Sequence, residues 1–185
     1  MATKGKKQVA ETDEIVAEEK EVVEEPVVEK TKKIVAKDVD LTEMITVKNG
    51  FNGRLVYISP RTHEKFVWDE FGDEQEIELR ELRNAKSSAK SFFINNWFMF
   101  DEEYEWVINY LGLHKYYDHA IKPSEFDDLF DRPADELKEI VSKLSKGQRK
   151  SVGYMARQKI ADGEIDSRKT VSMLESVLGI QLTEH

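Results

Sequence analysis

The sequence contains no cysteine among its 185 residues, which excludes a disulfide scaffold, a thiolate metal site and a cysteine nucleophile. It also lacks any long apolar run, so no segment is expected to span a membrane. The lysines near the N-terminus are not followed by an apolar stretch, so no secretory signal is expected. Nucleophile elbows, phosphate-binding loops and dinucleotide-binding glycine motifs are absent as well. We therefore expect a protein that is not an enzyme and needs no cofactor.

No residues stand at the spacing that is typical of metal ligands. His114 and His119 are five residues apart, which separates them by about 140° around a helix, whereas a helical zinc site uses positions i and i+4. The acidic runs at residues 69–74 and 101–105 do not follow the alternating pattern of a calcium loop. Because carboxylates commonly serve turns and helix starts, no metal site is expected at either run.

Aromatic residues are missing from the beginning of the chain, where glutamate and lysine dominate. Such a composition buries too little apolar area to offset the entropy cost of ordering. Residues 1–42 are therefore predicted to form a disordered or conditionally ordered charged arm. The pairs Ile15-Val16 and Val22-Val23 are seven residues apart, which hints at a heptad that Pro26 interrupts. An arm that orders on a neighbouring subunit remains open as the alternative.

Residues 43–86 have the alternation and the turn residues of a β-rich unit. The pairs Asn49-Gly50 and Asn52-Gly53 can each supply the positive φ of a tight turn, and Pro60 ends a strand. Strands are predicted where β-branched and aromatic residues gather or apolar residues alternate, at residues 45–47, 55–59, 65–68 and 74–79. Four strands this close in sequence predict an antiparallel meander or a small open barrel.

The rest of the chain divides into an aromatic-rich connecting segment at residues 87–122 and a helical subdomain at residues 123–185. Ser145 and Ser167 predict the starts of two helices in the subdomain, and Gly179 predicts the end of the second helix. The expected fold class is therefore α+β: a small antiparallel β-sheet or open barrel followed by a helical subdomain, with a disordered N-terminal arm.

Ten of the 18 aromatic residues lie between Phe92 and Tyr117. A platform for stacking bases would need lysine and arginine beside the rings, but the neighbouring charges are acidic. The cluster is instead expected to be a core that joins the β and helical parts, or a patch that contacts other proteins. The candidate contact residues from this cluster are Trp97, Phe98, Tyr104, Trp106 and Tyr110.

Charge is distributed unevenly along the second half of the chain. Residues 101–139 carry 12 acidic and 4 basic side chains, whereas residues 143–169 carry 8 basic and 3 acidic ones. The basic helix could be a solvated face, could contact DNA as in helix-turn-helix proteins, or could meet the acidic middle of another subunit head to tail. The net charge of −9 makes nucleic acid the weaker of these partners. The candidate contact residues of the basic helix are Arg149, Lys150 and Arg157.

The stretch from Met44 to Leu82 combines the segment MITVKN, an Asn-Gly turn, a strand that ends in Pro60, a Gly72-Asp73 turn and the passage EIELREL. Over residues 44–86 this pattern resembles small proteins encoded by tailed bacteriophages that infect Gram-positive bacteria. Members of that group have no assigned activity, so the resemblance implies a role in virion structure or assembly. It also implies a location in the virion, after assembly in the host cytoplasm.

These features predict a non-enzymatic phage protein that binds itself or other capsid, connector or tail proteins and has no membrane partner. The alternative is a phage regulatory protein that binds DNA or the host transcription machinery through the basic helix at residues 146–159.

Overall fold

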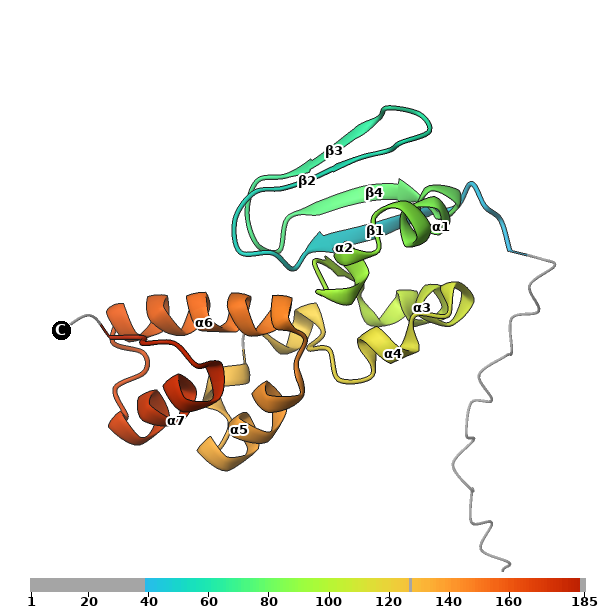
Figure 1. The fold of residues 1–185 in the computed structure, drawn as a ribbon. Coiled ribbons are helices and arrows are strands. Elements are labelled where there is room, and N and C mark those ends of the chain that lie inside the picture. Colours follow the sequence, from blue (N-terminus) through green and yellow to red (C-terminus); the bar gives the residue numbers. More distant parts are fainter. Residues whose placement is uncertain (1–38, 127, 184–185) are drawn as a thin grey trace, which may run out of the picture. The chain divides into compact units, whose positions relative to one another are not determined.

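The computed structural model describes residues 39–126 and 128–183, which form an α+β fold, so the fold class predicted from the sequence is confirmed (Figure 1). The predicted arm at residues 1–42 lies outside the described residues except for its last four positions. The strands are β1 (Met44–Asn49), β2 (Leu55–Ile58), β3 (Lys65–Trp68), β4 (Glu74–Glu78) and β5 (Phe98–Met99). The α-helices are α1 (Leu79–Ser88), α2 (Ser91–Ile94), α3 (Glu105–Leu111), α4 (His114–Tyr117), α5 (Ala134–Lys143), α6 (Lys146–Ala161) and α7 (Arg168–Leu178). Short 3-10 helices are η1 (Glu102–Tyr104), η2 (Pro123–Glu125) and η3 (Leu129–Asp131).

The first four strands lie where the sequence places them, but their pairing is not that of a meander. β1 pairs antiparallel with β4, from Met44 opposite Glu78 to Lys48 opposite Glu74, and its other edge pairs with β5. β2 and β3 form a separate two-stranded sheet. The β2–β3 hairpin is therefore an excursion of the chain between β1 and β4, which are neighbours in the sheet order β4-β1-β5.

Asn49 explains why β4 returns to β1. Its side chain is fully buried, and its Nδ2 donates to the carbonyl oxygen of Gly53, before β2, at 2.8 Å and to that of Glu70, after β3, at 2.7 Å. Its own main-chain N–H donates to the carbonyl of Asp73, and its carbonyl accepts from the N–H of Gly72. One asparagine thus holds together both ends of the excursion.

The two Asn-Gly pairs have different roles, which the sequence did not separate. Gly53 supplies the expected positive φ, at 112°. Gly50 instead allows a close approach of two loops, because a Cβ atom at this position would lie 2.2 Å from the carbonyl oxygen of Asn96. Only glycine fits there without moving the main chain.

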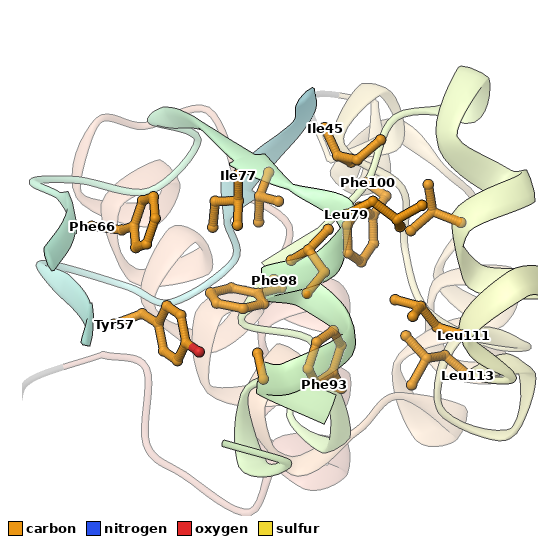
Figure 2. Close-up of a cluster of buried hydrophobic side chains, with 14 of the residues drawn as sticks. Ile45, Tyr57, Phe66, Ile77, Leu79, Phe93, Phe98, Phe100, Leu111 and Leu113 are labelled. Carbon is orange, nitrogen blue, oxygen red and sulfur yellow. The ribbon is translucent and has the colours of Figure 1, made fainter. Parts of the chain in front are cut away.

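The first of two hydrophobic cores lies between the two sheets and helices α1 to α3 (Figure 2). Side chains alternate along the hairpin, so that one face enters this core and the other faces outward. The indole N–H of Trp68 donates to the carbonyl of Val47 at 2.9 Å, which links the hairpin to β1. The inward residues of the hairpin are Leu55, Tyr57, Phe66 and Trp68.

Residues 87–122, expected as a connecting segment, complete this same core. Phe98 in β5 is fully buried, and its ring centroid lies 4.8–5.8 Å from those of four other aromatic residues, namely Tyr57, Trp68, Phe92 and Phe93. Edge-on and tilted pairs of this kind add about 0.5–1.5 kcal/mol each beyond the area that they bury. The β-rich part therefore needs β5 and α2 to close its core.

The second core belongs to the C-terminal helices. Ser145 and Ser167 cap α6 and α7 as predicted, with side chains that accept from the N–H groups of Gln148 and Thr170. Gly179 ends α7 in the left-handed conformation, also as predicted. The buried residues of this core are Met99, Ile121, Phe126, Leu129, Leu137, Val141, Leu144, Val152, Ala156, Leu174 and Leu182.

Candidate functional site

Helix α6 is held against the β-rich part by small and polar side chains at its start. Ser145 Oγ donates to the carbonyl of Asn95 at 3.1 Å, and Ser151 Oγ donates to the carbonyl of Gly50 at 2.7 Å. A Cβ atom on Gly147 would lie 2.1 Å from the carbonyl oxygen of Asn95. The first two turns of α6 therefore rest directly on the main chain of two loops.

A second side of α6 is buried in the helical subdomain. The fully buried Gln148 side chain bonds both main-chain groups of Ile121: its Oε1 accepts from the N–H at 3.1 Å and its Nε2 donates to the carbonyl at 2.9 Å. Val152 and Ala156 follow on the same side and enter the second core. With two sides of the helix covered, the remaining side faces outward.

The outward side carries three cations, Lys146, Lys150 and Arg157, which we call the basic stripe. All three side chains are exposed. At 100° per residue, these positions fall within about 40° of one another around the helix axis. The stripe therefore presents its charges in one direction.

Apolar side chains lie among the cations of the basic stripe. A Cβ atom on Gly153 would lie 2.8 Å from Cδ1 of Ile180, so the Ile180 side chain covers the helix between Lys150 and Arg157. Ile180 is 37% exposed, and Tyr154, which follows Gly153 in α6, is 44% exposed. Arg157 Nη2 also donates to the carbonyl of Gln181 at 2.7 Å, which fixes the chain segment that brings Ile180 there.

The cations of the basic stripe form no ion pair among the described residues, which they share with other exposed lysines such as Lys138 and Lys169. Within residues 39–126 and 128–183, carboxylates pair with cations elsewhere, as in the pairs of Lys122 with Glu102 and Lys143 with Glu139. None of the ion pairs in this part of the chain includes a cation of the basic stripe. Its charges are therefore open to an anionic partner.

Three contact residues were predicted from the basic helix, and they have different environments. Lys150 and Arg157 belong to the exposed stripe. Arg149 is half-buried, and its Nε donates to the carbonyl of Leu144 at 3.2 Å, so it also braces the corner between α5 and α6. Lys146 completes the stripe and was not among the predicted contact residues, although the helix spacing of four from Lys150 could have shown it.

The aromatic contact residues are placed mainly by the first core. Phe98 is fully buried, which contradicts its prediction as a contact residue: both residues of β5 are buried in the cores, so Phe98 leaves no surface for a partner. Trp97 is half-buried and packs edge-on against Phe51 and Phe92, with centroids 5.5 and 5.7 Å away. The remaining three predicted residues, Tyr104, Trp106 and Tyr110, are half-buried at the margin of the same core.

An acidic cleft of about 420 Å³ lies beside α3 and α4. Part of its charge is already neutralised, because Glu102 pairs with Lys122 at 3.0 Å and Asp101 pairs with Lys48 at 3.0 Å. Asn96 borders the cleft, and its buried Oδ1 has no hydrogen-bond partner among the described residues. The acidic residues that line the cleft are Asp101, Glu102, Glu105, Asp118 and Glu125.

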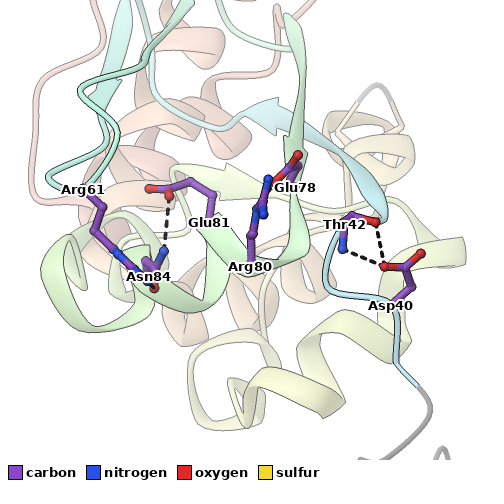
Figure 3. Close-up of polar contacts among 7 residues, drawn as sticks. All are labelled: Asp40, Thr42, Arg61, Glu78, Arg80, Glu81 and Asn84. Carbon is purple, nitrogen blue, oxygen red and sulfur yellow. Dashed lines mark hydrogen bonds and ion pairs between the residues drawn. The ribbon is translucent and has the colours of Figure 1, made fainter.

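A polar cluster between the hairpin and α1 serves the fold (Figure 3). The buried Glu81 accepts from Tyr57 Oη at 2.5 Å and from Asn84 Nδ2 at 3.3 Å, and Asn84 in turn accepts from Arg61 at 3.1 Å. Burial is the main cause that raises the pKa of Tyr57 far above its usual value, and the hydrogen bond to Glu81 is the second. The polar groups of this cluster thus join the β2–β3 hairpin to α1. Sequence reasoning missed the cluster because a glutamate between Arg80 and Arg83, which are both exposed, has the appearance of an exposed helix position.

Comparison of the chain with protein-family models, with curated protein sequences and with solved structures finds no match. Among the residues that the structure describes, no group of three or more histidine, aspartate and glutamate side chains could hold a metal ion. No helix in the same residues is long and apolar enough to cross a bilayer. The basic stripe, with its unpaired cations and exposed apolar residues, is therefore our candidate functional site.

Proposed function

We propose that the chain is a non-enzymatic structural or assembly protein that binds further copies of itself or other proteins. The observation that carries this proposal is the basic stripe. It presents three exposed cations without ion pairs on a chain whose net charge is −9, with Ile180 and Tyr154 exposed among them. Apolar area flanked by charge is typical of protein contact surfaces, where the charges select the partner and its orientation.

The virion is the setting that the resemblance of residues 44–86 supports. A virion component needs surfaces that complement one another, and it is assembled in the host cytoplasm. Quantitative mass spectrometry of density-purified particles of the encoding virus tests this setting, by counting copies of the chain per major capsid protein. A fixed ratio is the expected result, and absence from particles of a chain that is expressed during infection would remove the virion from the proposal.

DNA is the second candidate partner, because three cations on one helix face could also contact phosphates. The apolar residues within the stripe favour a protein instead, since Ile180 and Tyr154 would be set against a phosphate backbone. Binding to a labelled DNA duplex, followed by fluorescence anisotropy at about 50 mM salt, separates the two, because phosphate contacts strengthen steeply as salt falls.

Sedimentation velocity of the full chain tests self-binding. The variant carrying Lys146→Glu and Lys150→Glu should lose association, whereas a matched variant carrying Lys138→Glu and Lys169→Glu should keep it. Both variants change the net charge equally, and both control lysines are exposed on other helices. Association should also weaken between about 50 and 500 mM salt, over which exposed charges are increasingly screened. A chain that is monomeric throughout but binds the duplex would replace this proposal with the DNA alternative.

A further inference from the structure

We infer that the basic stripe docks the acidic segment at residues 11–29 of a neighbouring copy of this chain. The inference rests on the proposed function and names the partner surface. Residues 11–29 lie outside the described part of the chain, so the argument uses their sequence and the geometry of the stripe.

Charge complementarity is the first argument. Residues 11–29 carry nine acidic side chains and one lysine, whereas residues 30–38 carry four lysines and one aspartate. The acidic charge at the start of the chain is therefore confined to one segment with a basic end. Such a segment fits the unpaired cations of the stripe, and its basic end discourages a shifted register.

The apolar spacing is the second argument. The pairs Ile15-Val16 and Val22-Val23 are seven residues apart, with carboxylates between them. Lys150 and Arg157 are also seven residues apart, and Ile180 lies over the helix between them. A segment with this spacing can set an apolar pair against Ile180 and its carboxylates against the flanking cations.

The described chain enters the fold at one end of β1, and α6 contacts the loop after its other end. The carbonyl of Leu41 accepts from the N–H of Arg80 at 2.9 Å, and Asp40 accepts from Thr42, which fixes the entry ahead of β1 (Figure 3). α6 rests on Gly50, beyond the other end of β1.

Because the proposed function is self-binding, a neighbouring copy is the source of the segment. A contact between different surfaces of two copies builds rings or filaments.

The acidic cleft of a neighbouring copy is the competing partner for the stripe. Two of its carboxylates, Asp101 and Glu102, already pair with lysines of their own chain. Docking there would have to break or share these pairs. The carboxylates at residues 11–29 outnumber the single lysine of that segment ninefold, so they cannot be neutralised within it.

A charge swap in the full-length chain tests the inference by sedimentation velocity. The stripe variant carries Lys146→Glu and Lys150→Glu, the arm variant carries Glu18→Lys and Glu21→Lys, and the combined variant carries all four changes. We expect each of the first two to weaken self-association by about tenfold or more, and the combined variant to regain most of it. A misfolded chain cannot regain association through further charge reversals, so the combined variant is also the folding control.

Two results would overturn the inference alone. One is wild-type association that the arm variant leaves unchanged. The other is association that is lost on changing Glu102→Lys and Glu105→Lys in the acidic cleft, which would identify the cleft as the partner. A wild-type chain that stays monomeric at all concentrations would overturn the self-binding proposal together with the inference. The association of the wild-type chain therefore distinguishes failure of the proposal from failure of the inference alone.

Discussion

Gly147 packs so closely on the main chain of Asn95 that a Cβ atom there would lie 2.1 Å from the Asn95 carbonyl oxygen. This contact joins the first turn of α6 to the loop between α2 and β5. It determines which side of α6 is buried, and so it also determines that the basic stripe faces outward.

Replacing Gly147 should therefore destabilise the folded chain. We expect Gly147→Ala to lower the free energy of unfolding by about 3 kcal/mol, because a main-chain carbonyl cannot move aside as a side chain can. Gly153→Ala is the matched control on the same helix, where the new methyl group meets the flexible side-chain ends of Ile180 and Leu178 and no main-chain atom from outside α6 within 4 Å. Its effect should stay within about 1 kcal/mol, since alanine also favours the helix. Urea denaturation of both variants measures the difference, and equal losses would contradict the close-packing argument.

Gln148 should be the most sensitive polar residue of α6. Gln148→Ala leaves the buried N–H and carbonyl of Ile121 without partners, at a cost of about 3 kcal/mol for the two groups. Gln158→Ala, at an exposed position of the same helix, should change the unfolding free energy by less than about 0.5 kcal/mol. Equal effects of the two substitutions in chemical denaturation would show that the bonds to Ile121 contribute little.

Asn49 should tolerate no loss of its amide group. In Asn49→Asp, a carboxylate oxygen replaces the Nδ2 that donates to the carbonyls of Gly53 and Glu70. We expect a loss of about 3 kcal/mol at neutral pH, because a buried charge would face two acceptors. Protonation removes that charge, so the loss should become smaller as the pH falls.

The matched control for this variant is Asn52→Asp, on the partly exposed loop next to β1. It makes the same chemical change without facing two buried carbonyls, and it should be close to neutral. A loss from Asn49→Asp that does not exceed the control, or that grows on acidification, would contradict the role given to Asn49.

Two of the six tyrosines should resist ionisation until the chain unfolds. Burial raises the pKa of Tyr57 and of Tyr117 above the usual value, whereas a hydrogen bond from Lys115 lowers the pKa of Tyr116. Because the folded-state pKa values of Tyr57 and Tyr117 exceed the unfolded value of about 10, their contribution to stability is present below pH 10 and is lost as the pH rises beyond it.

Tyrosinate absorbance measured together with circular dichroism during an alkaline titration tests this prediction. The late part of the absorbance change should coincide with the loss of secondary structure. Tyr116→Phe should remove part of the early change and leave the late part intact. Complete ionisation of all six tyrosines in a folded chain would contradict the burial of Tyr57 and Tyr117.

Local signals in the sequence were sufficient to predict most of the longer helices and the first four strands. The capping serines Ser145 and Ser167 and the terminal Gly179 act within one helical turn, so the helix ends could be predicted without the fold. The pairing of β1 with β4 could not, because it depends on Asn49 bonding residues as far away as Asp73, 24 positions along the chain. The same limit hid the bond between Tyr57 and Glu81, which are 24 positions apart.

The candidate site was predictable in part. The basic character of α6 is evident in the sequence, but its outward side is set by Gly147 and Ser151, whose small size is the one local sign of a close contact. Trp97 and Phe98 show the opposite case. These neighbours in the sequence differ in burial, since Phe98 is fully buried and Trp97 is half-buried, yet nothing in two adjacent aromatic residues says which one lies deeper in the core.

The most direct test of the central claim, that copies of this chain bind through the basic stripe, is a mixing experiment with two defective full-length chains. The stripe variant carries Lys146→Glu and Lys150→Glu and keeps an intact arm, while the arm variant carries Glu18→Lys and Glu21→Lys and keeps an intact stripe. Each should be monomeric alone, and their mixture should form one stoichiometric complex of about twice the 21.5 kDa of a single chain, measured by light scattering after size exclusion. A mixture that stays monomeric, although the wild-type chain associates, would contradict the account.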